Sequence, residues 1–173
     1  MNYCLKCGGL LERKGPGKYI CIKCSRSFYD NPKSGVAIVL YTQDKKNIIL
    51  AKRSRNPSIG KLDFIGGFLD DGETFEDAAY RELEEESGLT RQDIGNLIYS
   101  TSIYNPYEWE GSIKPTVNAC FLVEIKKGAN ITAADDVEDF VHLKVDSLPL
   151  GDRCAWVNMD ATLSKMVQLL AEI

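Results

Sequence analysis

The stretch that decides the fold, residues 67–89, reads GFLDDGETFEDAAYRELEEESGL. It predicts a helix over about residues 74–87. Thr74 and Asp77 have the spacing of a capping box, in which each side chain accepts a hydrogen bond from the other residue's backbone N–H. Gly88 is placed where a left-handed residue ends a helix, a conformation that glycine adopts without steric cost. This stretch therefore carries the start and the stop signals of one helix.

The expected helix carries acidic side chains on the face that should be buried. Counted from Phe75, one face of the helix holds Ala78, Ala79, Glu82, Leu83 and Glu86. Such spacing is typical of a stripe that packs against a core. Glu85 stands one helical turn from Glu82. The carboxylates of Glu82, Glu85 and Glu86 are therefore expected to converge within one turn.

Helix energetics oppose this cluster of carboxylates. Like charges three or four residues apart repel by about 0.2–0.5 kcal/mol per pair, and the exposed carbonyls at the helix end disfavour Glu85 and Glu86 by about 0.3–1 kcal/mol each. A partly buried group of ionised carboxylates is tolerable when a cation neutralises it, and hard oxygen ligands suit Mg²⁺ or Mn²⁺. The alternative is a solvated acidic face. We assign Glu84, on the opposite side of the helix, to such a face. For the other three glutamates, the coincidence with the buried stripe favours a metal site.

The same stretch resembles the signature of the Nudix family, G-x5-E-x7-R-E-U-x-E-E-x-G-U, in which U is a bulky aliphatic residue. The matching positions are Gly67, Glu73, Arg81, Glu82, Leu83, Glu85, Glu86, Gly88 and Leu89. A looser resemblance extends over residues 36–149. It implies an α/β fold, an α/β/α sandwich with a mixed sheet. It also implies hydrolysis of a nucleoside diphosphate linked to another group, usually through attack of a metal-activated water on the pyrophosphate.

The resemblance also implies roles for individual residues. The metal ligands carried over from it are Glu82, Glu85, Glu86 and the carbonyl oxygen of Gly66. Glu82 would also help to deprotonate the attacking water. Arg81 and Glu73 would hold the helix and the loop before it in register. The expected cofactor at this site is Mg²⁺ or Mn²⁺.

Further candidates lie outside the signature. Lys52 and Arg53, at the end of an expected strand, are candidate phosphate contacts, and exposed strand-end charges are the alternative. Relatives often use an acid on a later loop as a base or an extra ligand. The candidates here are Asp135, Asp136, Glu138 and Asp139. We favour Asp136 from its distance to the segment VDSLP, and a solvated loop is the alternative.

One segment after the signature departs from the pattern of NADH pyrophosphatases, which the chain otherwise resembles. Their S-Q-P-W-P motif is absent, and TSIYNPYEWEGSIKPT, residues 101–116, stands in its place. Tyr104, Tyr107 and Trp109 in this segment are candidates to stack on a nucleobase. Packing within a loop is the alternative. The departure argues against assigning NADH as the substrate.

The N-terminal residues contain four cysteines in two C-x-x-C pairs. These are Cys4, Cys7, Cys21 and Cys24. Two such pairs on tight turns can surround a structural Zn²⁺ with four sulfurs at about 2.3 Å. Two disulfides are the alternative, which the absence of a secretion signal disfavours. We therefore expect a small zinc ribbon over residues 1–33, followed by a Nudix domain over residues 34–173.

The remaining expected elements complete an α/β pattern. A hairpin is expected from residues 36–41 and 47–51, and further strands near residues 97–103, 117–125 and 139–145. A last helix carries an apolar stripe of Leu163, Met166, Val167 and Leu170. We interpret this stripe as core packing.

Charge and hydropathy limit the expected partners. The net charge is −4, with basic residues concentrated before residue 34, and the acidic remainder argues against a broad nucleic-acid-binding face. No apolar stretch approaches the roughly 18 residues of a membrane span, so we expect a cytoplasmic protein. We expect a Mg²⁺-dependent hydrolase of ADP-ribose, a dinucleotide or a similar small nucleotide, with a homodimer possible by analogy alone. The alternative is a non-catalytic nucleotide sensor whose ribbon contacts nucleic acid or a protein.

Overall fold

The computed structural model describes residues 2–109 and 111–173, and of Trp109 it describes only the backbone. The chain divides into two compact units, Met1–Pro32 and Lys33–Ile173. Among the described residues, no helix is long and apolar enough to cross a membrane.

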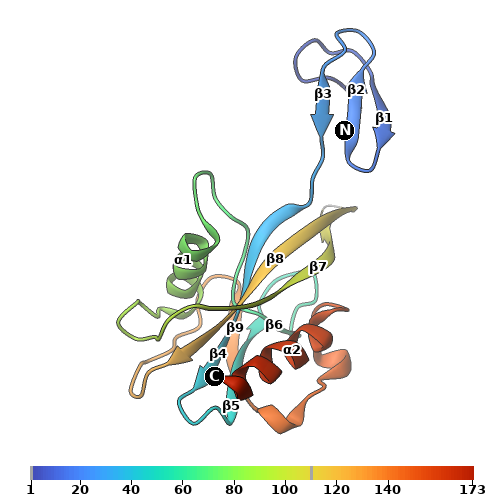
Figure 1. Ribbon diagram of the computed structural model, residues 1–173. Coiled ribbons are helices and arrows are strands. Elements are labelled where there is room, and N and C mark those ends of the chain that lie inside the picture. The colour runs from blue at the N-terminus through green and yellow to red at the C-terminus, as the bar shows by residue number, and fades with distance from the viewer. Residues whose placement is uncertain (1, 110) are drawn as a thin grey trace. The chain divides into compact units, whose positions relative to one another are not determined.

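The first unit is a small antiparallel sheet with two cysteine-bearing turns. Its strands, in the order β1-β2-β3, are β1 (Leu11–Gly15), β2 (Lys18–Cys21) and β3 (Ser27–Tyr29) (Figure 1). In the turns, the backbone N–H of Cys4 donates to the Gly9 carbonyl at 2.8 Å, and that of Cys21 donates to the Arg26 carbonyl at 2.9 Å. Within the described part of this unit, Cys4 and Cys21 are the only buried apolar side chains. Packing alone therefore offers this unit little stability, and a cross-link at the cysteines would supply it.

The second unit is built on a six-stranded mixed sheet. Its strands are β4 (Lys33–Thr42), β5 (Asn47–Arg53), β6 (Leu62–Asp63), β7 (Ile98–Trp109), β8 (Ser112–Ile125) and β9 (Val137–Lys144). The order is β6-β5-β4-β8-β7, and β9 pairs with β5. β4 and β8 run parallel, whereas the other paired strands are antiparallel. Residues 35–41 of β4 are all buried, as expected for a central strand covered on both faces.

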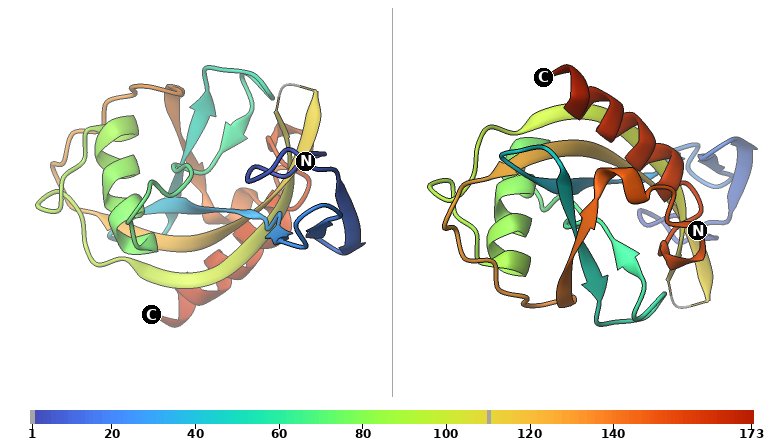
Figure 2. Two further views of the ribbon diagram at one scale, coloured as in Figure 1. Left: turned by 90° about the horizontal axis from the view of Figure 1, so that it is seen from above. Right: turned by 90° about the horizontal axis from the view of Figure 1, so that it is seen from below.

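Two helices cover the two faces of this sheet. α1 (Phe75–Ser87) and α2 (Met159–Glu172) lie on opposite sides (Figures 1 and 2). One core combines Val36, Ile38 and Leu40 of β4 with Ala78, Ala79 and Leu83 of α1. The other combines Ala37, Val39 and Tyr41 of β4 with Leu163, Met166 and Leu170 of α2. Because alternate residues of one strand enter different cores, the predicted α/β/α sandwich with a mixed sheet is confirmed.

The helix predicted from residues 67–89 has the expected ends. α1 is capped by Thr74, both hydrogen bonds of the capping box with Asp77 are present, and Gly88 ends the helix with φ of 69°. Two short 3₁₀ helices, η1 (Val145–Ser147) and η2 (Gly151–Arg153), lead from β9 to α2.

The predicted strands near residues 97–103 and 117–125 are too short. β7 and β8 continue the pairing outward, with Pro106 opposite Pro115. Proline cannot donate to a strand ladder, so it is normally confined to edge strands and strand ends. Here β7 is an edge strand, and the pairing of β8 with β4 begins only at Thr116, so neither proline interrupts an inner ladder. The aromatic segment is therefore strand rather than loop.

Candidate functional site

Arg81 connects α1 to the loop that precedes it. Its Nε and Nη2 donate to the two carboxylate oxygens of Glu73 at 2.7 and 2.9 Å, and Nη2 also donates to the Phe68 carbonyl at 3.0 Å. Its Nη1 donates to Glu82 at 2.8 Å and to Glu85 at 3.0 Å. The hydrogen bonds from Arg81, together with the N–H of Asp70, lower the pKa of Glu73 to about 2. The positions of Arg81 and Glu73 suit the expected role of holding loop and helix in register.

Glu82 and Glu86 are buried although they are acidic. Their exposed fractions are 8% and 6%. Burial raises the pKa of Glu86 to about 8, with the neighbouring charges of Glu82, Asp63 and Asp136 adding to the effect. Burial also raises the pKa of Glu82, against the opposing influence of Arg81. Both carboxylates therefore lie where a proton or a cation is favoured.

Two glycines allow the loop to approach these carboxylates. Gly66 has φ of 139°, and a side chain there would collide with the Val36 carbonyl. A side chain on Gly67 would collide with the carboxylate of Glu82. The N–H of Gly66 donates to Glu86 at 3.0 Å. The two glycines thus bring backbone groups against both buried acids.

The chemistry of this donor set fits a divalent cation. Glu82, Glu85 and Glu86 present hard oxygen atoms, which Mg²⁺ and Mn²⁺ prefer. One guanidinium, Arg81, does not balance these three carboxylates together with that of Glu73, and the neighbouring carboxylates add to the effect of burial in raising the pKa of Glu86. In the present arrangement, Glu82 and Glu85 hydrogen-bond to Arg81. For all three glutamates to bind one ion, the carboxylates of Glu82 and Glu85 would have to turn away from Arg81.

A cleft of about 230 Å³ opens beside Glu86. It runs between β4, β5, β6, β7 and β8, the loop before α1, the loop before β9 and the segment before α2. Five of the residues singled out from the sequence line it, namely Arg53, Gly66, Glu86, Tyr107 and Asp136. The cleft therefore joins the acidic end of α1 to an aromatic wall, which consists of Phe68, Tyr107 and Trp156.

A buried network forms one wall of the cleft. Asp63 accepts hydrogen bonds from Arg53 Nη1 at 2.6 Å and from Trp156 Nε1 at 2.8 Å. The guanidinium of Arg53 lies 5.2 Å from the centre of the Trp156 ring system, and its Nε donates to the Pro57 carbonyl at 2.7 Å. Burial raises the pKa of Asp63, and Arg53 opposes this. Arg53 is thus held by protein groups, and its guanidinium lies over the ring of Trp156.

Of the four later acids, Asp136 is the one that lines the cleft. Its Oδ1 lies 2.5 Å from Arg55 Nη1. The loop that carries it is tied to the end of α1, because the N–H of Ala134 donates to the Glu86 carbonyl at 3.0 Å. Glu138 instead pairs with Lys52 at 2.8 Å. Asp136 therefore faces the same space as Glu86.

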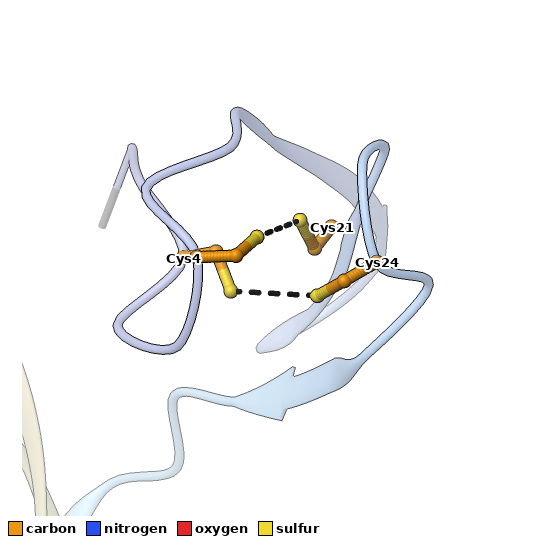
Figure 3. A group of neighbouring side chains, drawn as sticks. Cys4, Cys21 and Cys24 are labelled. Carbon is orange, nitrogen blue, oxygen red and sulfur yellow. Dashed lines mark hydrogen bonds between the residues drawn. The ribbon is translucent and has the colours of Figure 1, made fainter.

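The four cysteines of the first unit form a compact group. All four sulfurs lie within 4.8 Å of one another, with Cys4 Sγ 3.8 Å from Cys24 Sγ and Cys7 Sγ 3.5 Å from Cys21 Sγ (Figure 3). Sulfurs at about 2.3 Å from a tetrahedral zinc lie about 3.8 Å apart. All six cysteines of the chain are free thiols. The group fits a structural Zn²⁺ and not a pair of disulfides.

Comparison with known proteins identifies the larger unit. A model of the NUDIX domain matches residues 31–163, which is well over half of the chain. The chain belongs to the Nudix family. The glutamates of α1 and the loop through Gly66 and Gly67 lie within the matched region, so the predicted membership is confirmed.

Several Nudix relatives are known. The NAD-capped RNA hydrolases NudC of Photobacterium profundum and Escherichia coli are 27% and 28% identical over 149 and 150 residues, or 86% of this chain. The alignments cover 52% and 54% of those proteins, so the chain spans about half their length. A Nitrosomonas europaea NUDIX hydrolase structure has a TM-score of 0.68 at 23% identity, covering 99% of this chain and 92% of its own. Caenorhabditis elegans Ap4A hydrolase has a TM-score of 0.67 at 20% identity, covering 82% and 99%.

Other residues singled out from the sequence lie elsewhere in the Nudix unit. Lys52 lies outside the lining of the cleft and pairs with Glu138. Tyr104 also lies outside it, with 54% of its surface exposed, and the side chain of Trp109 is outside the described part of the chain. Of the candidate aromatic residues whose side chains the structure describes, Tyr107 alone is therefore placed at the cleft.

The residues of this Nudix cleft that sequence analysis did not single out include Asp63, Phe68, Asn105 and Trp156. Asp63 carried a weak signal, since it is an acid between the apolar Leu62 and Phe64. Asn105 and Trp156 had no comparable signal, because their place in the cleft depends on strand pairing and on the path of the segment before α2.

Proposed function

We propose that this protein hydrolyses the pyrophosphate linkage of a small nucleoside diphosphate derivative, such as ADP-ribose or a dinucleotide. Glu82, Glu85, Glu86 and the carbonyl of Gly66 would hold Mg²⁺ or Mn²⁺. The observation that carries the proposal is the pair of buried carboxylates, Glu82 and Glu86, packed against the glycine loop at one end of the cleft. Family membership adds independent support.

The chain's own groups have separate tasks in this proposal. When bound, the cation would neutralise phosphate oxygens and lower the pKa of a water molecule. Arg81 and Glu73 hold the glycine loop against α1, which keeps the Gly66 carbonyl and the glutamates together. Glu82 or Asp136 accepts the proton of the attacking water, since both are acids beside the same site. The aromatic wall excludes water from the remainder of the substrate.

Known relatives support a dinucleotide or related substrate. The NudC relatives are named for NAD-capped RNA, and two neighbours in structure are an Ap4A hydrolase and a domain complexed with ADP-ribose. These names share a nucleotide joined through phosphates to a second group. Free dinucleotides and ADP-ribose suit the small cleft.

The first unit serves as a structural module in this proposal. Residues 1–33 form a zinc ribbon and residues 34–173 form the hydrolase domain. Cysteines that are not oxidised to disulfides are typical of a reducing compartment, which supports a cytoplasmic location.

The test is an activity panel with matched glutamine variants. Purified protein with Mg²⁺ or Mn²⁺ is incubated with NAD⁺, NADH, ADP-ribose, Ap4A, a short NAD-capped RNA, nucleotide sugars and nucleoside triphosphates, and released mononucleotide is quantified. Glu85→Gln and Glu86→Gln are expected to lower kcat by roughly 10²-fold or more, the scale observed when a preorganised electrostatic group is removed. Glu84→Gln is the control, because Glu84 is exposed on the same helix.

The outcome distinguishes an enzyme from a sensor. Turnover of one compound class, lost in both variants and kept in the control, supports the hydrolase. Inactivity with every compound and metal, in a protein that still binds a nucleotide, refutes it and favours the non-catalytic sensor.

A further inference from the structure

An asparagine carboxamide oxygen is buried in the cleft without a hydrogen-bond partner among the described residues. Asn105 lies on β7 with 4% of its surface exposed, and it lines the cleft. Within the described residues, its Oδ1 has no hydrogen-bond donor. The backbone of Asn105 is satisfied separately, since its carbonyl accepts from Thr116 Oγ1 at 3.0 Å. Leaving a buried amide oxygen unpaired is costly, so this oxygen is available to a donor that enters the cleft.

Flat aromatic side chains surround the same space. Phe68, Tyr107 and Trp156 line the cleft together with Asn105. The rings of Tyr107 and Trp156 lie 5.3 Å apart, and those of Phe68 and Tyr107 lie 5.9 Å apart in an edge-to-face arrangement. These side chains come from the loop before α1, from β7 and from the segment before α2, and they converge only in the fold. Aromatic faces bind planar heterocycles by stacking.

Trp156 is held in a single orientation. Its Nε1 donates to Asp63 at 2.8 Å, and the guanidinium of Arg53 lies over its ring. Since its only hydrogen-bond donor is already used, Trp156 offers a ligand its apolar surface and not a polar contact. Next to this wall, Oδ1 of Asn105 is therefore a neutral acceptor that remains for recognition.

We propose that Asn105 and the aromatic wall form a nucleobase subsite selective for adenine. A carboxamide presents an acceptor and a donor side by side, and adenine offers the complementary pair, its 6-amino N–H beside a ring nitrogen. This subsite would specify the base of the substrate, and it rests on the proposed function because it requires a nucleotide to enter this cleft. A bare phosphate or a sugar would leave the aromatic wall unused.

The test compares two ligands that differ by one donor. Purine riboside 5′-monophosphate keeps the ring nitrogens and the stacking surface of AMP but lacks its 6-amino group. Binding to the full-length, zinc-loaded protein is measured by calorimetry. The wild type is expected to bind AMP about fivefold to tenfold more tightly, which is the scale of one hydrogen bond. Asn105→Leu is expected to bind the two ligands equally.

Two further variants separate recognition from structure. Trp156→Leu is expected to lower the affinity for both ligands by about fivefold or more and to keep the preference for AMP, because it removes a stacking surface and leaves the acceptor of Asn105 in place. Ser102→Leu, an exposed position on the same strand, is expected to change neither affinity. Circular dichroism shows whether each variant is folded.

The wild-type comparison decides the proposal even if a variant misfolds. Equal affinity for the two ligands, or no binding of AMP at millimolar concentration, overturns it, and so does a preference for AMP that survives in a folded Asn105→Leu protein. Binding is measured without turnover, so the two proposals can fail separately. A protein that prefers AMP but hydrolyses nothing would refute the hydrolase and support the adenine subsite. A protein that hydrolyses a nucleotide but binds the two ligands equally would support the hydrolase and refute the adenine subsite.

Discussion

Replacing Asp63 with asparagine should destabilise the Nudix unit strongly. Oδ2 of Asp63 accepts from Arg53 at 2.6 Å, whereas Oδ1 accepts from Trp156 Nε1 and from the N–H of Phe64, each at 2.8 Å. Asparagine has one carboxamide oxygen. If that oxygen keeps the bonds to Trp156 and Phe64, an NH₂ group faces the guanidinium of Arg53, whose side chain is only 12% exposed. Breaking a buried pair in this way costs about 3–5 kcal/mol.

The same strand provides a matched control for Asp63→Asn. Lys52, next to Arg53 on β5, pairs with Glu138 at 2.8 Å, and their side chains are 36% and 50% exposed. Exposed pairs contribute about 0–1 kcal/mol, so Glu138→Gln should have little effect on the free energy of unfolding. The two substitutions change a carboxylate to an amide in the same sheet and differ mainly in burial.

Urea unfolding followed by tryptophan fluorescence measures both variants. With an m-value of about 2 kcal/mol per M, a cost of about 3–5 kcal/mol lowers the midpoint by about 1.5–2.5 M. Glu138→Gln should shift it by less than about 0.5 M. Similar shifts in the two variants, or a loss below about 1 kcal/mol in Asp63→Asn, would refute the argument that burial makes the Asp63 pair structurally important.

Three further predictions concern the acidic site, the cysteine group and the core. The raised pKa of Glu86, about 8, means that its contribution to stability is full below about pH 4.5 and is lost as pH rises through 8. Without divalent cations the wild-type Tm should fall between about pH 5 and 8, Glu86→Gln should reduce this fall, and a Tm profile that is unchanged in the variant would contradict the assignment. Cys24→Ser should lower the zinc content measured by mass spectrometry, and full zinc retention would count against the four-cysteine site. Leu163→Ala should cost about 2–5 kcal/mol in urea unfolding because Leu163 is fully buried, whereas Val157→Ala, at a position 92% exposed, should cost less than about 0.5 kcal/mol; equal costs would refute the core assignment.

Local signals explain what could be predicted from the sequence. The capping box of Thr74, the stop at Gly88 and the clustering of glutamates all operate within a few residues of one helix. The two cysteine pairs likewise depend on tight turns. Because these patterns are short, the physics that produces them does not depend on the remainder of the fold.

Long-range packing explains what could not be predicted. Trp156 meets Asp63 across 93 positions in sequence, and no local pattern reports such a pair. Asn105 stands next to Pro106, so its neighbourhood indicated a loop, although the edge position of β7 lets the strand continue. Arg53 was a candidate phosphate contact, with an exposed strand-end charge as the alternative, and no local pattern predicted its bond to Asp63, which the pairing of β5 with β6 brings near it. The aromatic wall therefore depends on tertiary structure alone.

The distribution of hydrogen bonds separates the acidic residues of the site into two groups. Arg81 donates to Glu73, Glu82 and Glu85. Glu86 is the most buried of the α1 glutamates and has instead the N–H of Gly66. Burial raises the pKa of Glu86, and the partial charge of the Gly66 N–H offsets this only in part, whereas the hydrogen bonds from Arg81 lower the pKa of Glu73. Metal binding should therefore depend most strongly on Glu86, whereas Glu73 and Arg81 shape the loop around it.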